Sequence, residues 1–206
     1  MTSRHKHYLL ALAARGVPVV PTTLVERGQT CDLAAIAAPS IVIKPEIGAN
    51  SVGARRFAPA DPAAQAHLAA LTTQGAALVQ PYVASVDTYG ERSLVWIDGE
   101  LSHAIRKTPR FSGDAERIAG PFSIAADERT VALAALAPIA DRILYGRVDL
   151  ARDDAGHPMV MELELVEPSL YFAQKPSSAE RFVAGLRRYL ADPPASPRIS
   201  SATRAG

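Results

Sequence analysis

The sequence lacks both a strong charge imbalance and a long apolar segment. It contains 22 Lys and Arg residues against 21 Asp and Glu residues, which gives a formal net charge of +1. A chain with so little net charge has no field that attracts nucleic acid or an anionic membrane surface. No apolar run approaches the roughly 20 residues of a membrane-spanning helix, and the polar residues 2–7 do not resemble a signal peptide. We therefore expect a cytoplasmic protein whose partners are neither nucleic acids nor membranes.

Cysteine is almost absent, since Cys31 is the only one in the chain. A disulfide within the chain is therefore impossible, which fits a reducing compartment. No His/Cys cluster has the spacing of a zinc site, and no Gly-x-Ser-x-Gly string marks a serine nucleophile. We interpret Cys31 as a small buried hydrophobe and His103 as a packing or hydrogen-bonding residue in a strand. The sequence thus offers no clear protein nucleophile.

Hydrophobic residues make up 48% of the 206 positions, which is enough for one sizeable domain or two small lobes. Apolar periodicity and turn residues predict helices interspersed with antiparallel hairpins, and therefore an α+β fold. The predicted helices cover residues 5–15, 62–74, 127–144 with an interruption or a kink at Pro138, and 178–190. The predicted strands cover residues 41–45, 77–83, 93–97, 101–105, 145–150 and 160–169. Residues 108–126 are expected to be a loop, and residues 191–206 a disordered tail.

Two acidic strands in the last third of the chain are the most informative feature of the sequence. Asp149 lies on the first strand, Glu162 and Glu164 lie on the second, and a short polar turn joins the two. Residues two apart in a strand point the same way and lie about 7 Å apart, so an antiparallel hairpin would bring the three carboxylates together. Oxygen ligands of this kind select Mg²⁺ or Mn²⁺, and bound Mg²⁺ usually also holds a substrate phosphate. The alternative is a solvated acidic face on a surface hairpin.

Lys44 ends an apolar strand just before a loop of small residues that extends to Gly53. Backbone N–H groups in such a loop can approach an anion closely, and a neighbouring lysine adds a positive charge. The combination suits the phosphates of a nucleotide, although no P-loop string is present. The alternative is an ordinary turn after a Lys-Pro pair.

Several basic residues accompany these segments. Lys107, Arg110 and Arg117 lie in or just before the predicted loop, and Arg147 shares a strand face with Asp149. Beside a metal–carboxylate site, such cations would bind a substrate carboxylate or a transferring phosphoryl group. Without that site, they would be ordinary solvated charges.

Taken in order, these segments resemble the ATP-grasp superfamily, and within it the ATP-binding domain of the prokaryotic glutathione synthetase-like branch. The matching strings are Ile41-Val42-Ile43-Lys44-Pro45 with the loop after it, Val79-Gln80-Pro81-Tyr82-Val83, Gly90-Glu91-Arg92-Ser93, and the two acidic strands. No single string is specific. Their order and spacing, however, match the family from about Lys6 to Phe172.

The resemblance implies two α+β lobes of antiparallel sheet with ATP held between them. The lid lobe would span about 17–83 and the larger lobe 84–190, within an ATP-grasp domain of residues 1–190. The residues implied for ATP are Lys6 and Lys44 at the phosphates, Gly48, Ser51 and Gly53 in the lid loop, Gln80, Pro81, Tyr82 and Val83 at the adenine, and Glu91 at the ribose. The residues implied for the chemistry are Asp149, Glu162 and Glu164 at Mg²⁺, Arg117 at the transferred charge, and Lys107, Arg110, Arg147 and Ser169 in the acceptor pocket.

The resemblance further implies an ATP- and Mg²⁺-dependent ligase that joins a small-molecule carboxylate to an amine through an acylphosphate. Glutathione synthetase-like, peptide ligase-like and cyclo-ligase-like reactions all fit, and the string of residues 102–109 favours the cyclo-ligase group. Two departures stand out: Glu164 replaces the commoner Asn, and the family's N-terminal domain has no counterpart before the ATP-binding core. The alternatives are therefore a truncated ATP-binding module without catalysis, and a structural α+β protein with an acidic hairpin. A homo-oligomer is compatible with either kind of function.

Overall fold

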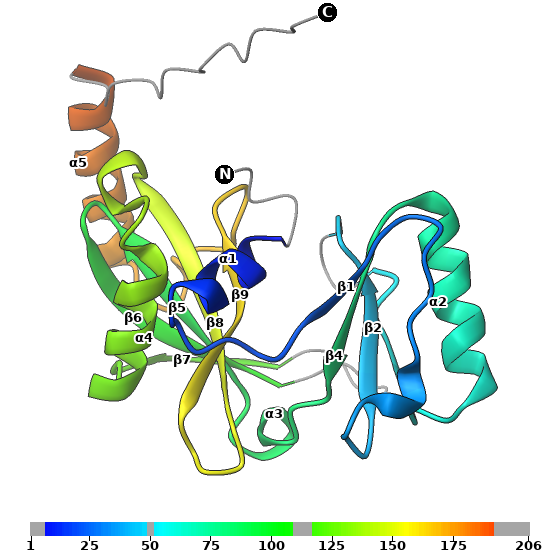
Figure 1. The fold of residues 1–206 in the computed structure, drawn as a ribbon. Helices are drawn as coiled ribbons and strands as arrows, with labels where there is room; N and C mark the ends of the chain where they lie inside the picture. The colour runs from blue at the N-terminus through cyan, green and yellow to red at the C-terminus, as the bar shows by residue number, and fades with distance from the viewer. Residues whose placement is uncertain (1–6, 49–51, 109–116, 192–206) are drawn as a thin grey trace, which may run out of the picture.

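The protein folds into two antiparallel sheets, each with its own helices, which form a smaller and a larger lobe (Figure 1). The computed structural model describes residues 7–48, 52–108 and 117–191. The smaller sheet has the order β1-β4-β2-β3, from strands β1 (Thr23–Val25), β2 (Ile41–Pro45), β3 (Arg55–Phe57) and β4 (Ala77–Pro81). The larger sheet has the order β7-β6-β5-β8-β9, from strands β5 (Glu91–Ile97), β6 (Glu100–Lys107), β7 (Ile118–Phe122), β8 (Tyr145–Arg152) and β9 (Pro158–Glu164). The expected α+β class is confirmed.

Short helices complete both lobes. The helical elements are α1 (Tyr8–Ala14), η1 (Leu33–Ala35), α2 (Pro62–Gln74), α3 (Ser85–Thr88), α4 (Ala126–Leu136), η3 (Ala140–Arg142) and α5 (Ser177–Ala191). In the smaller lobe, Ile41 and Ile43 of β2 are completely buried in one apolar cluster with Leu68 of α2. Since side chains alternate along a strand, Lys44 points to the opposite face of β2.

Helices α1 and α4 cover one face of the larger sheet. Leu94 of β5 and Val148 of β8 point to this face and are buried in one cluster with Leu9 of α1 and Leu136 of α4. The alternate residues of β5, β6 and β8 therefore point to the opposite face, which we call the site face.

Helix α5 packs on one end of the site face. Its Phe182 contacts Tyr145 of β8, with ring centroids 5.7 Å apart. Gly185 lies so close to the sheet that a Cβ there would be 2.7 Å from Leu144 Cδ1 and 2.8 Å from Asp98 Cγ. A side chain at position 185 would therefore push α5 away from the β5–β6 turn. The helix covers the Tyr145 end of β8 and leaves the middle of that strand to the site.

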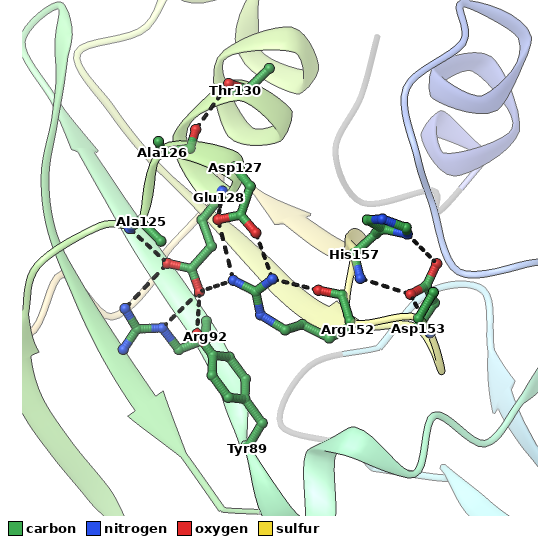
Figure 2. Close-up of polar contacts among 12 residues, drawn as sticks. Tyr89, Arg92, Ala125, Ala126, Asp127, Glu128, Thr130, Arg152, Asp153 and His157 are labelled. Carbon is green, nitrogen blue, oxygen red and sulfur yellow. Dashed lines mark hydrogen bonds and ion pairs between the residues drawn. The ribbon is translucent and has the colours of Figure 1, made fainter.

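A buried ionic network joins α4 to the sheet on the other face (Figure 2). Glu128, 1% exposed, accepts hydrogen bonds from the Tyr89 hydroxyl at 2.9 Å and from Arg92 Nε at 3.0 Å. Arg92 Nη2 also donates to Glu128 Oε2 at 3.2 Å. Arg152 of β8 bonds Asp127 at 2.6 Å, one residue before Glu128. The network thus holds α4 against both β5 and β8.

The segment between α1 and β1 belongs with the larger lobe. Val19 forms a parallel bridge with Val160 of β9, and Val20 N donates to Val160 O at 3.0 Å. The Tyr8 hydroxyl accepts a hydrogen bond from Leu163 N at 2.9 Å. Residues 17–20, assigned to the lid lobe from the sequence, therefore pair with the last strand of the larger sheet.

Some elements differ from the sequence predictions. The helix predicted over 127–144 is interrupted at Pro138, one of the two predicted outcomes: α4 ends at Leu136 because Pro138 cannot continue helical hydrogen bonding, and only the short η3 follows. The loop predicted over 108–126 contains β7, an edge strand on which Pro121 is tolerated. Strands β1 and β3 were missed, because three residues carry too little periodicity to be recognised.

Candidate active site

Three carboxylates converge on the β8–β9 hairpin. Asp149 of β8 lies opposite Glu162 of β9 in the strand register, and Glu164 lies opposite Arg147. One carboxylate oxygen from each of Asp149, Glu162 and Glu164 lies within 4.8 Å of the other two. This is the convergence expected from the acidic strands. Oxygen atoms at such separations can hold one hard divalent cation, such as Mg²⁺.

Asp149 is held by two cations. Arg147 donates to both of its oxygens, Nε to Oδ1 and Nη2 to Oδ2, each at 2.8 Å. Lys107 Nζ also donates to Oδ2, at 3.1 Å. Complete burial opposes ionisation, but Lys107 and Arg147 outweigh it and lower the pKa of Asp149 well below its usual range. The carboxylate is therefore ionised at physiological pH.

Glu164 shares the same guanidinium. Arg147 Nη2 lies 2.8 Å from Glu164 Oε1, so the residue that departs from the usual family pattern has a cationic partner in the site. Burial raises the pKa of Glu164, and Arg147 opposes that rise. The Arg147 guanidinium therefore links one carboxylate from each strand of the hairpin.

Glu91 lies beside this cluster. It is opposite Lys107 in the β5–β6 register, and its carboxylate pairs with Lys107 Nζ. Burial raises the pKa of Glu91 to about 7, Lys107 opposes the rise, and Asp149 adds to it. The sequence assigned Glu91 to the ribose of ATP. The structure places it among the charged groups around Asp149, and the ribose role stays a prediction.

Lys44 brings the smaller lobe into contact with the carboxylates. Its Nζ lies 3.8 Å from Glu162 Oε1, across the junction of the two lobes, and its side chain is only 12% exposed. A triphosphate between the lobes would therefore meet Lys44 on one side and the carboxylates of the hairpin on the other.

The segment predicted to read adenine passes from one sheet to the other. Gln80 is buried in β4, and its Nε2 donates to Thr22 Oγ1 at 2.8 Å. Pro81 ends β4, and Tyr82 and Val83 follow before α3 begins. The placement between the lobes is compatible with a hinge, and adenine binding stays a prediction.

The other predicted site residues lie at the surface or outside the described residues. Arg117, just before β7, and Ser169, after β9, are both exposed. Gly48 and Gly53 are exposed on either side of residues 49–51. Outside the described residues lie Lys6, Ser51, Arg110 and the tail from residue 192.

Sequence reasoning missed two buried polar residues on the site face. Ser93 is completely buried and lies opposite Asp149 in the β5–β8 register. His103, interpreted from the sequence as a packing or hydrogen-bonding residue, is 2% exposed. Strand alternation could have found both, because Ser93 is two residues from Glu91 and His103 is four from Lys107.

Comparison with known proteins shows one close relative and a shared fold. No protein-family model matches the chain. The cycloserine biosynthesis protein DcsG of Streptomyces lavendulae is 38% identical over 208 residues, which cover 90% of this chain and 69% of that protein. The crystal structure of D-cycloserine synthetase DcsG has a TM-score of 0.80 at 37% identity, over 91% of this chain and 70% of that one. The ATP-grasp ligase PsnB has a TM-score of 0.62 at 17% identity, over 89% of this chain and 60% of that one.

The chain belongs to the ATP-grasp superfamily. The D-alanine–D-alanine ligase of Bacillus anthracis shares the ATP-grasp fold, with a TM-score of 0.69 at 15% identity over 92% of this chain and 66% of that one. The superfamily expected from the sequence, and with it a ligase, is confirmed. The glutathione synthetase-like branch stays a prediction. Across the described parts of this ATP-grasp chain, no helix has both the length and the apolar character needed to cross a membrane.

Proposed function

We propose that this ATP-grasp chain is a Mg²⁺-dependent ligase that activates the carboxylate of a small amino-acid-like substrate as an acylphosphate and joins it to an amine. The observation that supports this most is a carboxylate cluster faced by cations from both lobes. Lys44 reaches it from the smaller lobe, and Lys107 and Arg147 reach it from the larger one. Such alternating charge suits a metal bound together with a polyphosphate.

Asp149, Glu162 and Glu164 would hold the Mg²⁺ (or Mn²⁺). The donor set fits, since it consists of carboxylate oxygens only and their atoms converge within 4.8 Å. Among the described residues, these three carboxylates and Glu91 pair with three cations, which are Lys44, Lys107 and Arg147. The cluster therefore has at most one excess negative charge. Metal alone should therefore bind weakly, and metal with ATP should bind well. When bound, Mg²⁺ would offset the charge of the phosphates during transfer.

The charged side chains would serve phosphoryl transfer followed by acyl transfer. The substrate carboxylate attacks the γ-phosphorus of ATP, which forms an acylphosphate and releases ADP. The amine then attacks the acyl carbon, and inorganic phosphate leaves with the bonding electrons. Lys44 would bind the phosphates of ATP, while Lys107 and Arg147 would bind the carboxylate and the transferring phosphoryl group. No protein nucleophile is required, because positioning and charge stabilisation suffice.

The relatives support a substrate class. DcsG is named as a D-cycloserine synthetase, and its identity of 37% with this chain supports closure of a ring within a small amino-acid derivative. In that case the carboxylate and the amine belong to the same molecule. The D-alanine–D-alanine ligase, at 15% identity, supports the fold alone.

Thermal unfolding with ATP, with Mg²⁺ and with both together tests the proposal. A ligand at a hundred times its Kd stabilises the folded state by roughly 2.7 kcal/mol. For a chain of this size that is about 5–10 °C in Tm. We expect a full shift only with both ligands, and none with Glu162→Gln as the matched control.

Phosphate release from ATP, driven by small amino acids and amino-acid derivatives, then tests for turnover. A Tm shift without any substrate-driven release would favour the non-catalytic ATP-binding module. No shift in a folded sample would refute the metal–nucleotide site.

A further inference from the structure

His103 lies on the site face beside the groups that carry the proposed function. It is opposite Val95 in the β5–β6 register, and Val95 is opposite Arg147 in the β5–β8 register. His103 and Arg147 therefore flank one residue on the same face, with Cα atoms about 10 Å apart at ordinary strand spacing. Lys107 points the same way four residues further along β6, whereas Ala104 points into the core on the opposite face.

The imidazole of His103 is buried but only half paired. Its Nδ1 lies 3.1 Å from Ser102 Oγ. Its Nε2 is inaccessible to solvent and has no hydrogen-bond partner among the described residues. Burial lowers the pKa of His103 to about 4, and Lys175 adds to this shift, so the ring is neutral at physiological pH. An unpaired buried nitrogen costs free energy, and a bound ligand is one way to satisfy it.

Lys175 is the cation that acts on the His103 ring, and Arg147 lies against the same segment of chain as Lys175. Lys175 Nζ donates to Ser102 O at 2.8 Å, on the residue next to His103. The Arg147 guanidinium lies 5.8 Å from the centre of the Tyr171 ring. The segment from Tyr171 to Lys175 therefore runs over the part of the site face that carries both Arg147 and His103. A ligand bound beside the His103 ring would meet the positive charge of Lys175, which favours an oxygen atom with partial or full negative charge.

On the basis of the proposed function, we propose that His103 Nε2–H donates a hydrogen bond to a carboxylate or carbonyl oxygen of the amino-acid substrate. In this tautomer, Nδ1 accepts from the Ser102 hydroxyl. His103 lies on β6, two strands away from Arg147 of β8 and on the side opposite β9. It would therefore contact the part of the substrate that is remote from the metal. A neutral N–H donor would orient the substrate oxygen there without adding a second positive charge beside Lys175. His103 would thus be a specificity-determining residue of the acceptor pocket.

Two substitutions test this contact. His103→Gln can place an amide N–H near the position of Nε2, and His103→Leu removes the donor while keeping much of the volume. The probe is D-cycloserine, titrated calorimetrically into protein saturated with Mg²⁺ and ADP, with D-alanine as a second probe. We expect His103→Leu to weaken D-cycloserine binding at least tenfold and His103→Gln to weaken it less than threefold. The Tm and the nucleotide affinity of His103→Leu should change little, because loss of the hydrogen bond between Nδ1 and Ser102 is offset by removal of the unpaired Nε2.

Other outcomes would overturn the assignment. Unchanged D-cycloserine affinity in His103→Leu would show that Nε2 does not contact the ligand. Equal losses in both variants, together with a lower Tm, would show a packing role. Wild-type protein that binds Mg²⁺ and ATP but neither probe would refute the proposed contact and substrate class while leaving the nucleotide site intact. Failure to bind Mg²⁺ and ATP would instead refute the proposed function.

Discussion

Replacement of Asp149 by Asn separates two roles of the carboxylate cluster, which are metal binding and charge balance within the fold. Asp149 is completely buried and accepts hydrogen bonds from Arg147 and Lys107. Removal of one partner from a buried ion pair typically costs about 3–5 kcal/mol. The lower end applies here, because Lys107 keeps Glu91 as a partner and Arg147 keeps Glu164. At about 2–4 °C per kcal/mol for this chain length, the Tm should fall by about 6–12 °C.

Glu162→Gln is the matched comparison. The Glu162 side chain is 26% exposed, and its ion pair with Lys44 spans 3.8 Å. Such a partly solvated pair contributes about 1 kcal/mol or less, so the Tm should change by no more than about 4 °C. Both Asp149→Asn and Glu162→Gln should nevertheless abolish the joint stabilisation by Mg²⁺ and ATP, since each removes a proposed metal ligand.

Scanning calorimetry of the wild type and both variants, with and without Mg²⁺ and ATP, provides the readout. Equal Tm values for the two unliganded variants would refute the argument that Arg147 and Lys107 depend on Asp149. A full ligand-induced shift in either variant would refute that residue as a metal ligand. Circular dichroism at 20 °C confirms that both variants are folded before the comparison is made.

Three further predictions concern single side chains. Lys44→Ala should weaken ATP binding at least tenfold by titration calorimetry in the presence of Mg²⁺, and unchanged affinity would exclude Lys44 from the phosphates. The pKa of Glu91 is raised to about 7 in the folded state, so the folded protein binds a proton at this carboxyl more tightly than the unfolded chain does. The free energy of unfolding that this proton contributes is lost as the pH rises through 7. Glu91→Gln should therefore flatten the fall in unfolding free energy between pH 5.5 and 8 in urea titrations, and an unchanged slope would contradict this. Glu128→Ala leaves Arg92 buried without its carboxylate and should cost about 3–5 kcal/mol, whereas Asp127→Asn, at an exposed pair, should cost about 1 kcal/mol or less.

The parts of the fold that sequence predicted best are those in which local pattern and tertiary environment agree. The helix predicted over 62–74 is α2 with the same bounds, because Pro62 at its start and Gly75 after its end act locally. The Asp98-Gly99 turn likewise defined the β5–β6 hairpin. Strand β7 could not be predicted, because its composition is that of a loop and only pairing with β6 makes it a strand.

In the candidate site, too, local features could be predicted from the sequence and features that depend on tertiary pairing could not. Convergence of the three carboxylates could be predicted, since alternation within one hairpin places them together. The position of Glu91 could not, because its partner Lys107 is fixed by the register of a different strand pair. The unpaired nitrogen of His103 was equally out of reach, since hydrogen-bond satisfaction depends on residues brought together from distant parts of the chain.

The way in which α1 is held has a consequence for the order of folding during synthesis. The Tyr8 hydroxyl meets Leu163 N, 155 residues later in the chain, and the smaller sheet lies wholly between the two, within residues 23–81. The smaller lobe can therefore close as soon as it emerges from the ribosome, whereas α1 keeps its apolar side uncovered until β9 has been made. Contacts of such long sequence separation form slowly, because a long loop must close first. Helix α1 is thus expected to dock only after β9 has formed, and its Leu9 and Leu12 stay uncovered on the nascent chain until then.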